Sequence, residues 1–302
     1  MSEATMKLLL PVDVTQTHDD LVDHISWLLP IAGCDVIVLF VKEILPSYEQ
    51  LLESMGDFPE DINHQMDDKA RTVLGELESE LKGRARSCKV EIVSGPTAWM
   101  INEVAKDHGI DLTVVTPGPD ARVRRYLMGS TSSHVVKHTH SDVLVLRDDP
   151  RYDKLTSLVI ALDGSQDSLT AMSRSVDLLG LKERKVDITL TSVVNISAAL
   201  KVISPVTFLA ALEDNLMMEG EAMLAAAAAS LDKEGVSGVT TQLKNGDPAG
   251  EIIAVAEKHK AQLIVTGAKG RGAVAQMVMG SVSDRVSSHA PCSTLVVKGG
   301  AS

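Results

Sequence analysis

The chain contains an internal repeat, and this constrains its fold more than any other feature. When the sequence is shifted by 151 positions, residues of the same kind match over long stretches without a gap. The turn 95–98 falls on 246–249, and Gly129-Ser130 falls on Gly280-Ser281. Solenoid repeats run about 20 to 50 residues, so a period this long indicates two duplicated domains.

The length of the chain agrees with a division into two domains. At 302 residues it provides one domain over 1–150 and a second over 151–302, each large enough to bury a core. The first strands of the two copies also resemble each other, since 8–13 matches 158–163 at an offset of 150. A polar segment around Pro150 is typical of a short interdomain linker.

Within each copy, short runs of Val, Ile and Leu alternate with helical patterns. The expected strands are near 7–12, 35–41, 89–93, 111–115 and 142–147, then near 157–162, 186–194, 239–244, 262–266 and 293–298. The expected helices of the second copy are near 166–180, 213–234, 248–260 and 281–289. This order predicts, for each domain, a five-stranded parallel sheet with helices on both faces. Right-handed crossovers then place the ends of its first and fourth strands side by side.

Composition excludes several classes of function. A net charge of −12 argues against a nucleic-acid surface, which needs a concentrated basic face. No apolar run approaches the roughly 18 residues of a membrane span, and Met1–Lys7 lacks a charged segment followed by a long apolar one, so we expect neither membrane insertion nor export. Cys34, Cys88 and Cys292 form no CxxC or metal pattern, so we expect a reducing cytoplasm.

A glycine-rich segment in the second copy predicts an anion site. Gly267-Ala268-Lys269-Gly270 follows the apolar run 263–266, and Gly280-Ser281-Val282-Ser283 comes nine residues later, where a helix should begin. Open α/β sheets bind nucleotides at this edge. Glycines allow close approach of the backbone, and the amide groups at a helix start favour a phosphate. The alternative is an ordinary turn with a serine cap, since the spacing is not that of a P-loop.

These residues resemble those of the universal stress proteins. The ATP signature of that family, Gly-x2-Gly-x9-Gly-Ser/Thr, is met by Gly267, Gly270, Gly280 and Ser281. The resemblance covers essentially the whole chain as two copies. It implies two tandem Rossmann-like domains of the adenine nucleotide α-hydrolase-like type, with ATP and Mg²⁺ bound in the second.

The resemblance also implies roles for individual residues of the second copy. Asp163 would contact the nucleoside, while the backbone at Ala161 and Val193 would line the adenine pocket. The residues that would wrap the ribose and phosphates are Gly267, Gly270, Gly280, Ser281, Val282 and Ser283. An Asx turn that needs no ligand is the alternative role of Asp163.

The first copy departs from this pattern at the phosphate loop. The offset places Thr116 and Pro119 where Gly267 and Gly270 stand, and proline removes a backbone donor. We therefore expect low or no nucleotide affinity there. The remaining equivalents predict a pocket for another small ligand; they are Pro11, Asp13, Val41, Gly129 and Ser130. Three nearby arginines would either receive an anion or form a solvated basic stretch; they are Arg122, Arg124 and Arg125.

Two further segments have open interpretations. His134, His138 and His140 would either converge on a zinc ion or take no part in a site. Without a further ligand of regular spacing, we expect no metal, with His134 and His138 exposed and His140 in the following turn. The apolar segment 198–206 would wall the nucleotide pocket, form a partner surface or pack into the core.

Three functional classes are compatible with these features. The first is a regulatory stress protein whose nucleotide occupancy changes its interactions. The second is a slow ATPase or self-phosphorylating protein, although the chain has no P-loop lysine, dedicated base or kinase motif set. The third is a scaffold without nucleotide. The resemblance further implies that 143–146 and 294–297 pair antiparallel in an internal pseudo-dimer. Further pairing of whole chains is left open, and 202–205 offers apolar surface for it.

Overall fold

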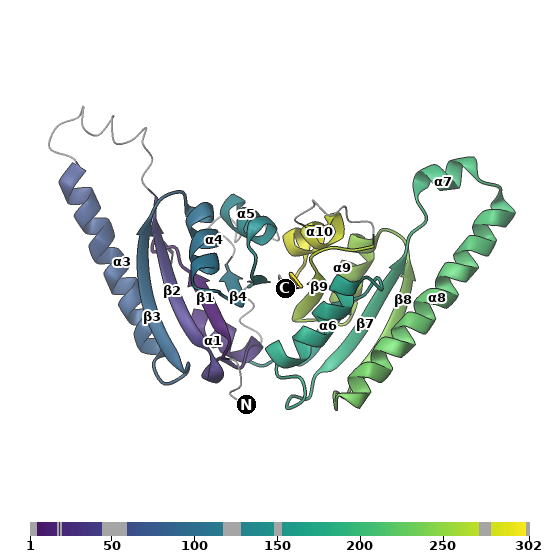
Figure 1. Ribbon diagram of the computed structural model, residues 1–302, viewed down its shortest axis with the longest axis horizontal. Helices are drawn as coiled ribbons and strands as arrows, with labels where there is room; N and C mark the ends of the chain where they lie inside the picture. Colours follow the sequence, from purple (N-terminus) through teal and green to yellow (C-terminus); the bar gives the residue numbers. More distant parts are fainter. Residues whose placement is uncertain are drawn as a thin grey trace.

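In a computed structural model, the two halves of the chain form two α/β domains that share one sheet (Figure 1). The structure describes residues 5–16, 18, 20–43, 59–116, 128–147, 153–271 and 279–299. Pro119, the three arginines of the altered loop and Pro150 of the linker therefore lie outside the described residues.

Each domain has a five-stranded parallel sheet, as the alternating pattern predicted. The strands of the first are β1 (Lys7–Pro11), β2 (Asp35–Lys42), β3 (Ser87–Ser94), β4 (Leu112–Val115) and β5 (Asp142–Val145). Those of the second are β6 (Ser157–Ala161), β7 (Asp187–Val194), β8 (Val239–Asn245), β9 (Leu263–Gly267) and β10 (Ser293–Val297). The order β3-β2-β1-β4-β5-β10-β9-β6-β7-β8 places the first and fourth strands of each domain side by side.

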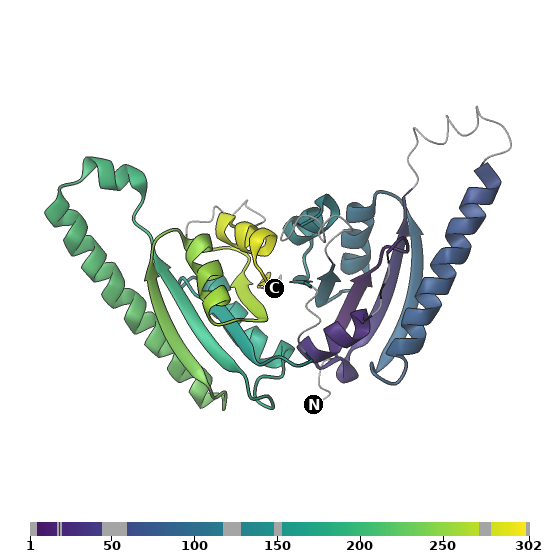
Figure 2. The ribbon, with the colours of Figure 1, turned by 180° about the vertical axis from the view of Figure 1, so that it is seen from behind.

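Helices cover both faces of the sheet (Figures 1 and 2). One face carries α1 (Leu21–Leu28), α3 (Pro59–Leu81), α6 (Gln166–Leu178) and α8 (Val206–Lys233). The other face carries α4 (Thr97–Asp107), α5 (Ser130–His138), α9 (Pro248–Lys258) and α10 (Ser281–His289). A 3₁₀ turn, η1 (Ile31–Gly33), follows α1, and α7 (Ala198–Ile203) precedes α8. Within the described ranges, no helix has the length and hydrophobicity that a membrane span requires.

The helix that we expected near 213–234 begins earlier, at Val206, and α7 was not expected. The Ser197 side chain caps α7, and Pro205 at the N-cap of α8 separates the two helices. Apart from Thr207, the first two turns of α8 are apolar, so they lack the one-sided periodicity by which amphipathic helices are recognised.

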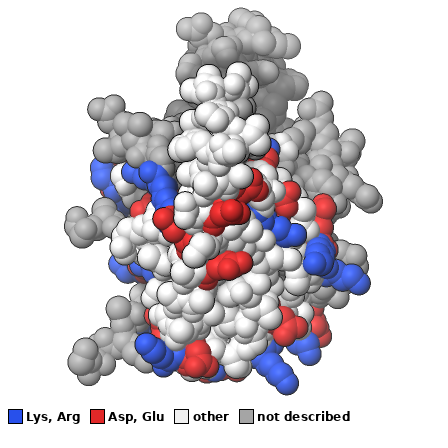
Figure 3. Space-filling model, turned by 90° about the vertical axis from the view of Figure 1, so that its right-hand side faces the viewer, with Lys and Arg blue, Asp and Glu red and all other residues white. Residues whose placement is uncertain are grey.

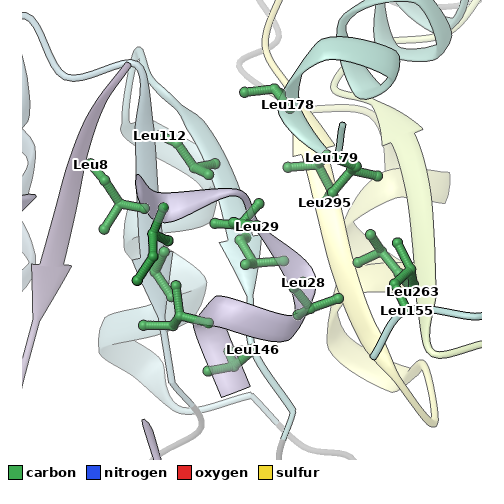
Figure 4. Close-up of a cluster of buried hydrophobic side chains, with 14 of the residues drawn as sticks. Leu8, Leu28, Leu29, Leu112, Leu146, Leu155, Leu178, Leu179, Leu263 and Leu295 are labelled. Carbon is green, nitrogen blue, oxygen red and sulfur yellow. The ribbon is translucent and has the colours of Figure 1, made fainter. Parts of the chain in front are cut away.

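Alternate side chains of each strand enter different layers of the core. Leu8 and Leu10 of β1 join a cluster that continues from the first domain into the second, whereas Leu9 enters the cluster beneath α4 and α5. Figure 4 shows the first of these clusters, where Leu29 of the first domain lies opposite Leu179 of the second. The two domains are thus joined by buried apolar surface as well as by the linker.

The edges of the two sheets pair across the domain boundary. β5 and β10 are antiparallel, with Leu144 opposite Leu295. All the residues of both strands are buried, as expected for an edge that has been covered. The predicted pairing of the terminal strands within one chain is therefore confirmed.

Two basic residues at equivalent positions each donate hydrogen bonds to the other domain. Arg147 follows β5, and its guanidinium donates to the carbonyls of Ser287 and Ser288 at the end of α10, at 3.0 and 3.1 Å. Lys298 follows β10, and its ammonium donates to the Val136 carbonyl at the end of α5, at 2.5 Å. Each cation satisfies carbonyls in the last turn of the helix from the other domain.

A buried carboxylate strengthens this boundary. Asp142 of β5 accepts hydrogen bonds from the Lys298 amide at 2.8 Å and from the Arg174 guanidinium of α6 at 2.6 Å. Burial raises the pKa of Asp142, although these donors partly oppose the shift. Burial likewise lowers the pKa of Lys298 to about 8. The boundary thus has specific polar contacts within a mainly apolar interface.

Candidate functional site

The site expected in the second domain lies where β6 and β9 end beside each other. These strands are parallel neighbours, with Leu158 opposite Leu263. Ala161 ends β6 and is buried, while Val193 near the end of β7 is partly buried against the cluster beneath α9 and α10. The loops after β6 and β9 therefore meet at the carboxyl edge of the sheet.

Asp163 connects these two loops. Its Oδ1 accepts hydrogen bonds from the Ser165 amide at 3.0 Å and the Ser165 hydroxyl at 2.6 Å, which forms the Asx turn considered above. Its Oδ2 accepts the Arg271 amide at 2.9 Å. Burial by itself would raise the pKa of Asp163, but these donors hold it below its ordinary value. The residue is thus an ionised carboxylate that fixes the glycine loop.

Gly270 and Gly280 lie so close to neighbouring atoms that a side chain at either position would be crowded. A Cβ on Gly270 would lie 2.6 Å from Oδ2 of Asp163. A Cβ on Gly280 would lie 3.3 Å from the Ala268 carbonyl oxygen, to which the Gly280 amide already donates at 2.7 Å. A side chain at position 270 would therefore press on Asp163, and one at position 280 would crowd the loop where it meets α10.

Gly267 has a different role in the structure. Its Cβ would come within 2.7 to 2.9 Å of backbone atoms of Asp167 and Ser168 in the first turn of α6. Close packing of β9 against α6 therefore requires glycine here, whatever ligand the loop binds. The first domain has Thr116 at this position, so its strand and helix must meet differently.

The first turn of α10 has no side-chain cap among the described residues. Gly280 is its N-cap, whereas α6 is capped by Ser165 and α9 by Asp247. The amides of Ser281 and of the two residues after it, Val282 and Ser283, belong to this turn, whose backbone donors have no partner within the helix. Together with the helix dipole, these donors favour a bound anion.

The Ser283 hydroxyl is engaged by the protein itself. Its Oγ donates to the Gly267 carbonyl at 2.5 Å and is buried, while Ser281 is exposed. The first domain repeats this contact, since Ser132 donates to the Thr116 carbonyl at 3.0 Å. These two serines attach the helix to the strand in both domains, which the sequence motif alone does not reveal.

Basic residues also border the loop of the second domain. The Lys269 amide donates to Asp167 at 3.2 Å. The Arg271 guanidinium lies over Gly164, which has a φ of +74° and leaves no space for a Cβ. Sequence reasoning did not assign roles to Gly164 and Arg271, although the Asp163-Gly164-Ser165 turn contained a signal for the first.

The first domain contains a cavity at the equivalent place. Its volume is about 730 Å³, and it lies at the ends of β1, β2 and β4 beside the start of α5. All the residues expected for a degenerate pocket line it, namely Pro11, Asp13, Val41, Gly129 and Ser130. The structure thus brings these residues together around one space.

Asp13 is held in the same way as Asp163. It accepts hydrogen bonds from the Thr15 amide at 2.9 Å, from the Thr15 hydroxyl at 2.6 Å and from the Gln16 side chain at 3.0 Å. Burial would raise the pKa of Asp13, but these donors keep it below its ordinary value.

The histidines of α5 stack on each other. The rings of His134 and His138 stack with their centroids 4.1 Å apart. Among the described residues, no group of three metal-ligating side chains is assembled.

The apolar segment 198–206 does not pack into the core. Val202, Ile203 and Val206 are 85, 78 and 82% exposed, so that interpretation is wrong. Figure 3 shows this face, where uncharged surface lies above acidic side chains.

Comparison with known proteins agrees with the fold and the duplication. The sequence model of the Universal stress protein family matches residues 5–147 and again residues 155–298. Universal stress protein MJ0531 of Methanocaldococcus jannaschii is 33% identical over 141 residues, which are 47% of this chain and 81% of that protein. Universal stress protein YxiE of Bacillus subtilis is 30% identical over 147 residues, which are 47% of this chain and 97% of that protein.

A solved structure shows the same two-domain fold over the full length. The crystal structure of a universal stress protein from Archaeoglobus fulgidus is similar with a TM-score of 0.65 and 19% identity. The match covers 98% of this chain and 97% of that one. The chain therefore belongs to the universal stress protein family and carries two tandem copies of its domain.

Proposed function

We propose that the second domain binds one ATP and that its occupancy changes the surface offered to a partner, as a regulatory step in stress adaptation. The observation that carries this proposal is the first turn of α10. It has no side-chain cap among the described residues and begins beside a loop where a Cβ on Gly270 would lie 2.6 Å from Asp163 and one on Gly280 would lie 3.3 Å from the Ala268 carbonyl oxygen. Membership of the universal stress protein family supports the role in stress.

Each part of the site has a defined role in this proposal. The phosphates would lie against the amides of the first turn of α10 and near the basic side chains of Lys269 and Arg271. The Asp163 carboxylate, at the end of β6, would accept hydrogen bonds from ribose hydroxyls. Ala161 and Val193 would border the adenine ring.

The phosphates themselves would supply most ligands of a Mg²⁺ ion. This fits the chemistry of Mg²⁺, which keeps several waters and binds protein through one or two carboxylates at most. The donors around Asp163 and its lowered pKa make its carboxylate a weak base. Binding without rapid hydrolysis is therefore the function that the site supports best.

Calorimetric titration of the full chain with ATP and Mg²⁺ tests the proposal. We expect a stoichiometry near one per chain, with heat of binding only from the second domain. Phosphate release measured on the same preparation should remain near background. Two equivalent sites, or no binding, would contradict the proposal, and steady release of phosphate would make the chain a slow ATPase instead.

We also place the protein in the cytoplasm. All three cysteines are free thiols, as is usual in a reducing compartment.

A further inference from the structure

The described residues at the two equivalent sites differ in charge. In the second domain, Lys269 and Arg271 stand in the glycine loop beside Asp163. In the first domain, the same offset places Gly118 and Asp120 at the positions of these two cations, and Arg122, Arg124 and Arg125 follow in the same loop, which lies outside the described residues.

The residues that follow β2 and β7 also differ in charge between the two domains. The alignment that matches Val41 with Val193 also matches Glu43 with Asn195, so the first domain has a carboxylate where the second has a neutral amide. Glu43 lines the first-domain cavity and is fixed there by the Thr97 hydroxyl, which donates to it at 3.0 Å. The adjacent cation does not neutralise it, because the Lys42 ammonium is paired with Asp67 at 2.8 Å.

Within the described part of the chain, the charged groups that line the cavity are both acidic. Among the described residues around it, Asp13 and Glu43 are the ionisable ones. The walls between them are mainly apolar and come from several elements; they include Phe40, Ile101, Val115, Met128 and Val135. The volume of about 730 Å³ is in the range of sites for small organic molecules.

We propose that the first-domain cavity binds an organic cation, a small molecule that carries an ammonium or guanidinium group on an apolar body. The apolar walls would cover the body, and the fixed carboxylates of Asp13 and Glu43 would pair with the charge. The half-buried carboxylate of Asp13 and the exposed one of Glu43, on otherwise apolar walls, favour a cationic partner and oppose a polyphosphate, which would place like charges together. This assignment does not depend on ATP binding in the second domain.

Three probes with one ring system test the charge preference directly. Tryptamine is cationic, tryptophol is neutral and indole-3-acetate is anionic at neutral pH. Their binding to the full chain is measured by ligand-observed NMR titration. We expect tryptamine to bind about tenfold more tightly than tryptophol, a difference of about 1.4 kcal/mol, and indole-3-acetate to bind most weakly.

Variants separate the cavity from the overall negative charge of the protein. Glu43→Gln and Asp13→Asn should each reduce the affinity for tryptamine severalfold and leave that for tryptophol unchanged. Glu91→Gln removes the same charge from β3, outside the residues that line the cavity, and should leave both affinities unchanged. Glu43 is exposed, so its replacement should not disturb folding.

Several results would overturn the proposal. One is the absence of tryptamine binding, and another is an affinity for indole-3-acetate equal to that for tryptamine. The latter would show that the arginines at 122, 124 and 125 set the charge of the site. An equal loss of tryptamine affinity in Glu91→Gln and Glu43→Gln would show that the preference for a cation comes from the overall negative charge of the protein and not from the cavity.

Discussion

Replacing Gly280 with valine is expected to lower the affinity of the chain for ATP by at least about a hundredfold. The new Cβ would lie 3.3 Å from the Ala268 carbonyl oxygen and 3.7 Å from the Gly270 amide, so the side chain would fill the space between the loop and α10. Loss of two hydrogen bonds to phosphate corresponds to about 3 kcal/mol or more. Calorimetry with ATP and Mg²⁺ measures the effect.

The duplication provides a matched control for this variant. Gly129→Val makes the same change at the start of α5 and should leave ATP binding unchanged. The fold should persist in Gly280→Val, because a φ of −77° and a ψ of 152° suit valine. Ser281→Ala keeps its backbone amide and should weaken binding by only about 1 to 3 kcal/mol. Unchanged affinity in Gly280→Val would show that phosphates do not bind here.

Proline in place of Leu144 or Val296 should destabilise the whole chain by roughly 3 to 5 kcal/mol. Both residues are fully buried in the strands that join the domains, so proline removes a ladder donor and apolar contacts at once. We expect a lower melting temperature and faster proteolysis near Pro150, because the two halves would separate more readily. Thermal unfolding and limited proteolysis measure the two effects.

Leu144→Ala separates the contribution of the ladder from that of packing. This variant keeps the backbone amide and loses side-chain contacts, so it should be less protease-sensitive near the linker than Leu144→Pro. If both proline variants kept the stability and protease resistance of the wild type, the domains would be held together by other contacts. The polar contacts of Arg147, Asp142 and Lys298 would then be the next candidates.

Much of the fold was predictable because buried parallel strands are apolar along their whole length. The run at 263–266 corresponds to β9, and the predicted helix at 281–289 corresponds to α10. The start of α8 was not predictable in this way, because its first turns are exposed yet apolar and show no buried stripe. Val206 begins α8 directly after the N-cap residue Pro205, and its side chain is exposed.

The candidate site was only partly predictable from its motif. Motif spacing located the glycines and Asp163, but it did not distinguish Gly267, which is required by the first turn of α6, from Gly270 and Gly280. Nor did it indicate that the Ser283 hydroxyl is bound to the Gly267 carbonyl. These roles depend on contacts between elements distant in sequence, which a linear pattern does not contain.

The central claim is that the loop and helix of the second domain, and not those of the first, bind nucleotide. Amide hydrogen exchange of the full chain with and without ATP and Mg²⁺ tests it most directly, because it reports both loops in one experiment. We predict slower exchange at 267–271 and 279–283, with no change at 128–132. Protection at 128–132, or none in the first turn of α10, would contradict the claim.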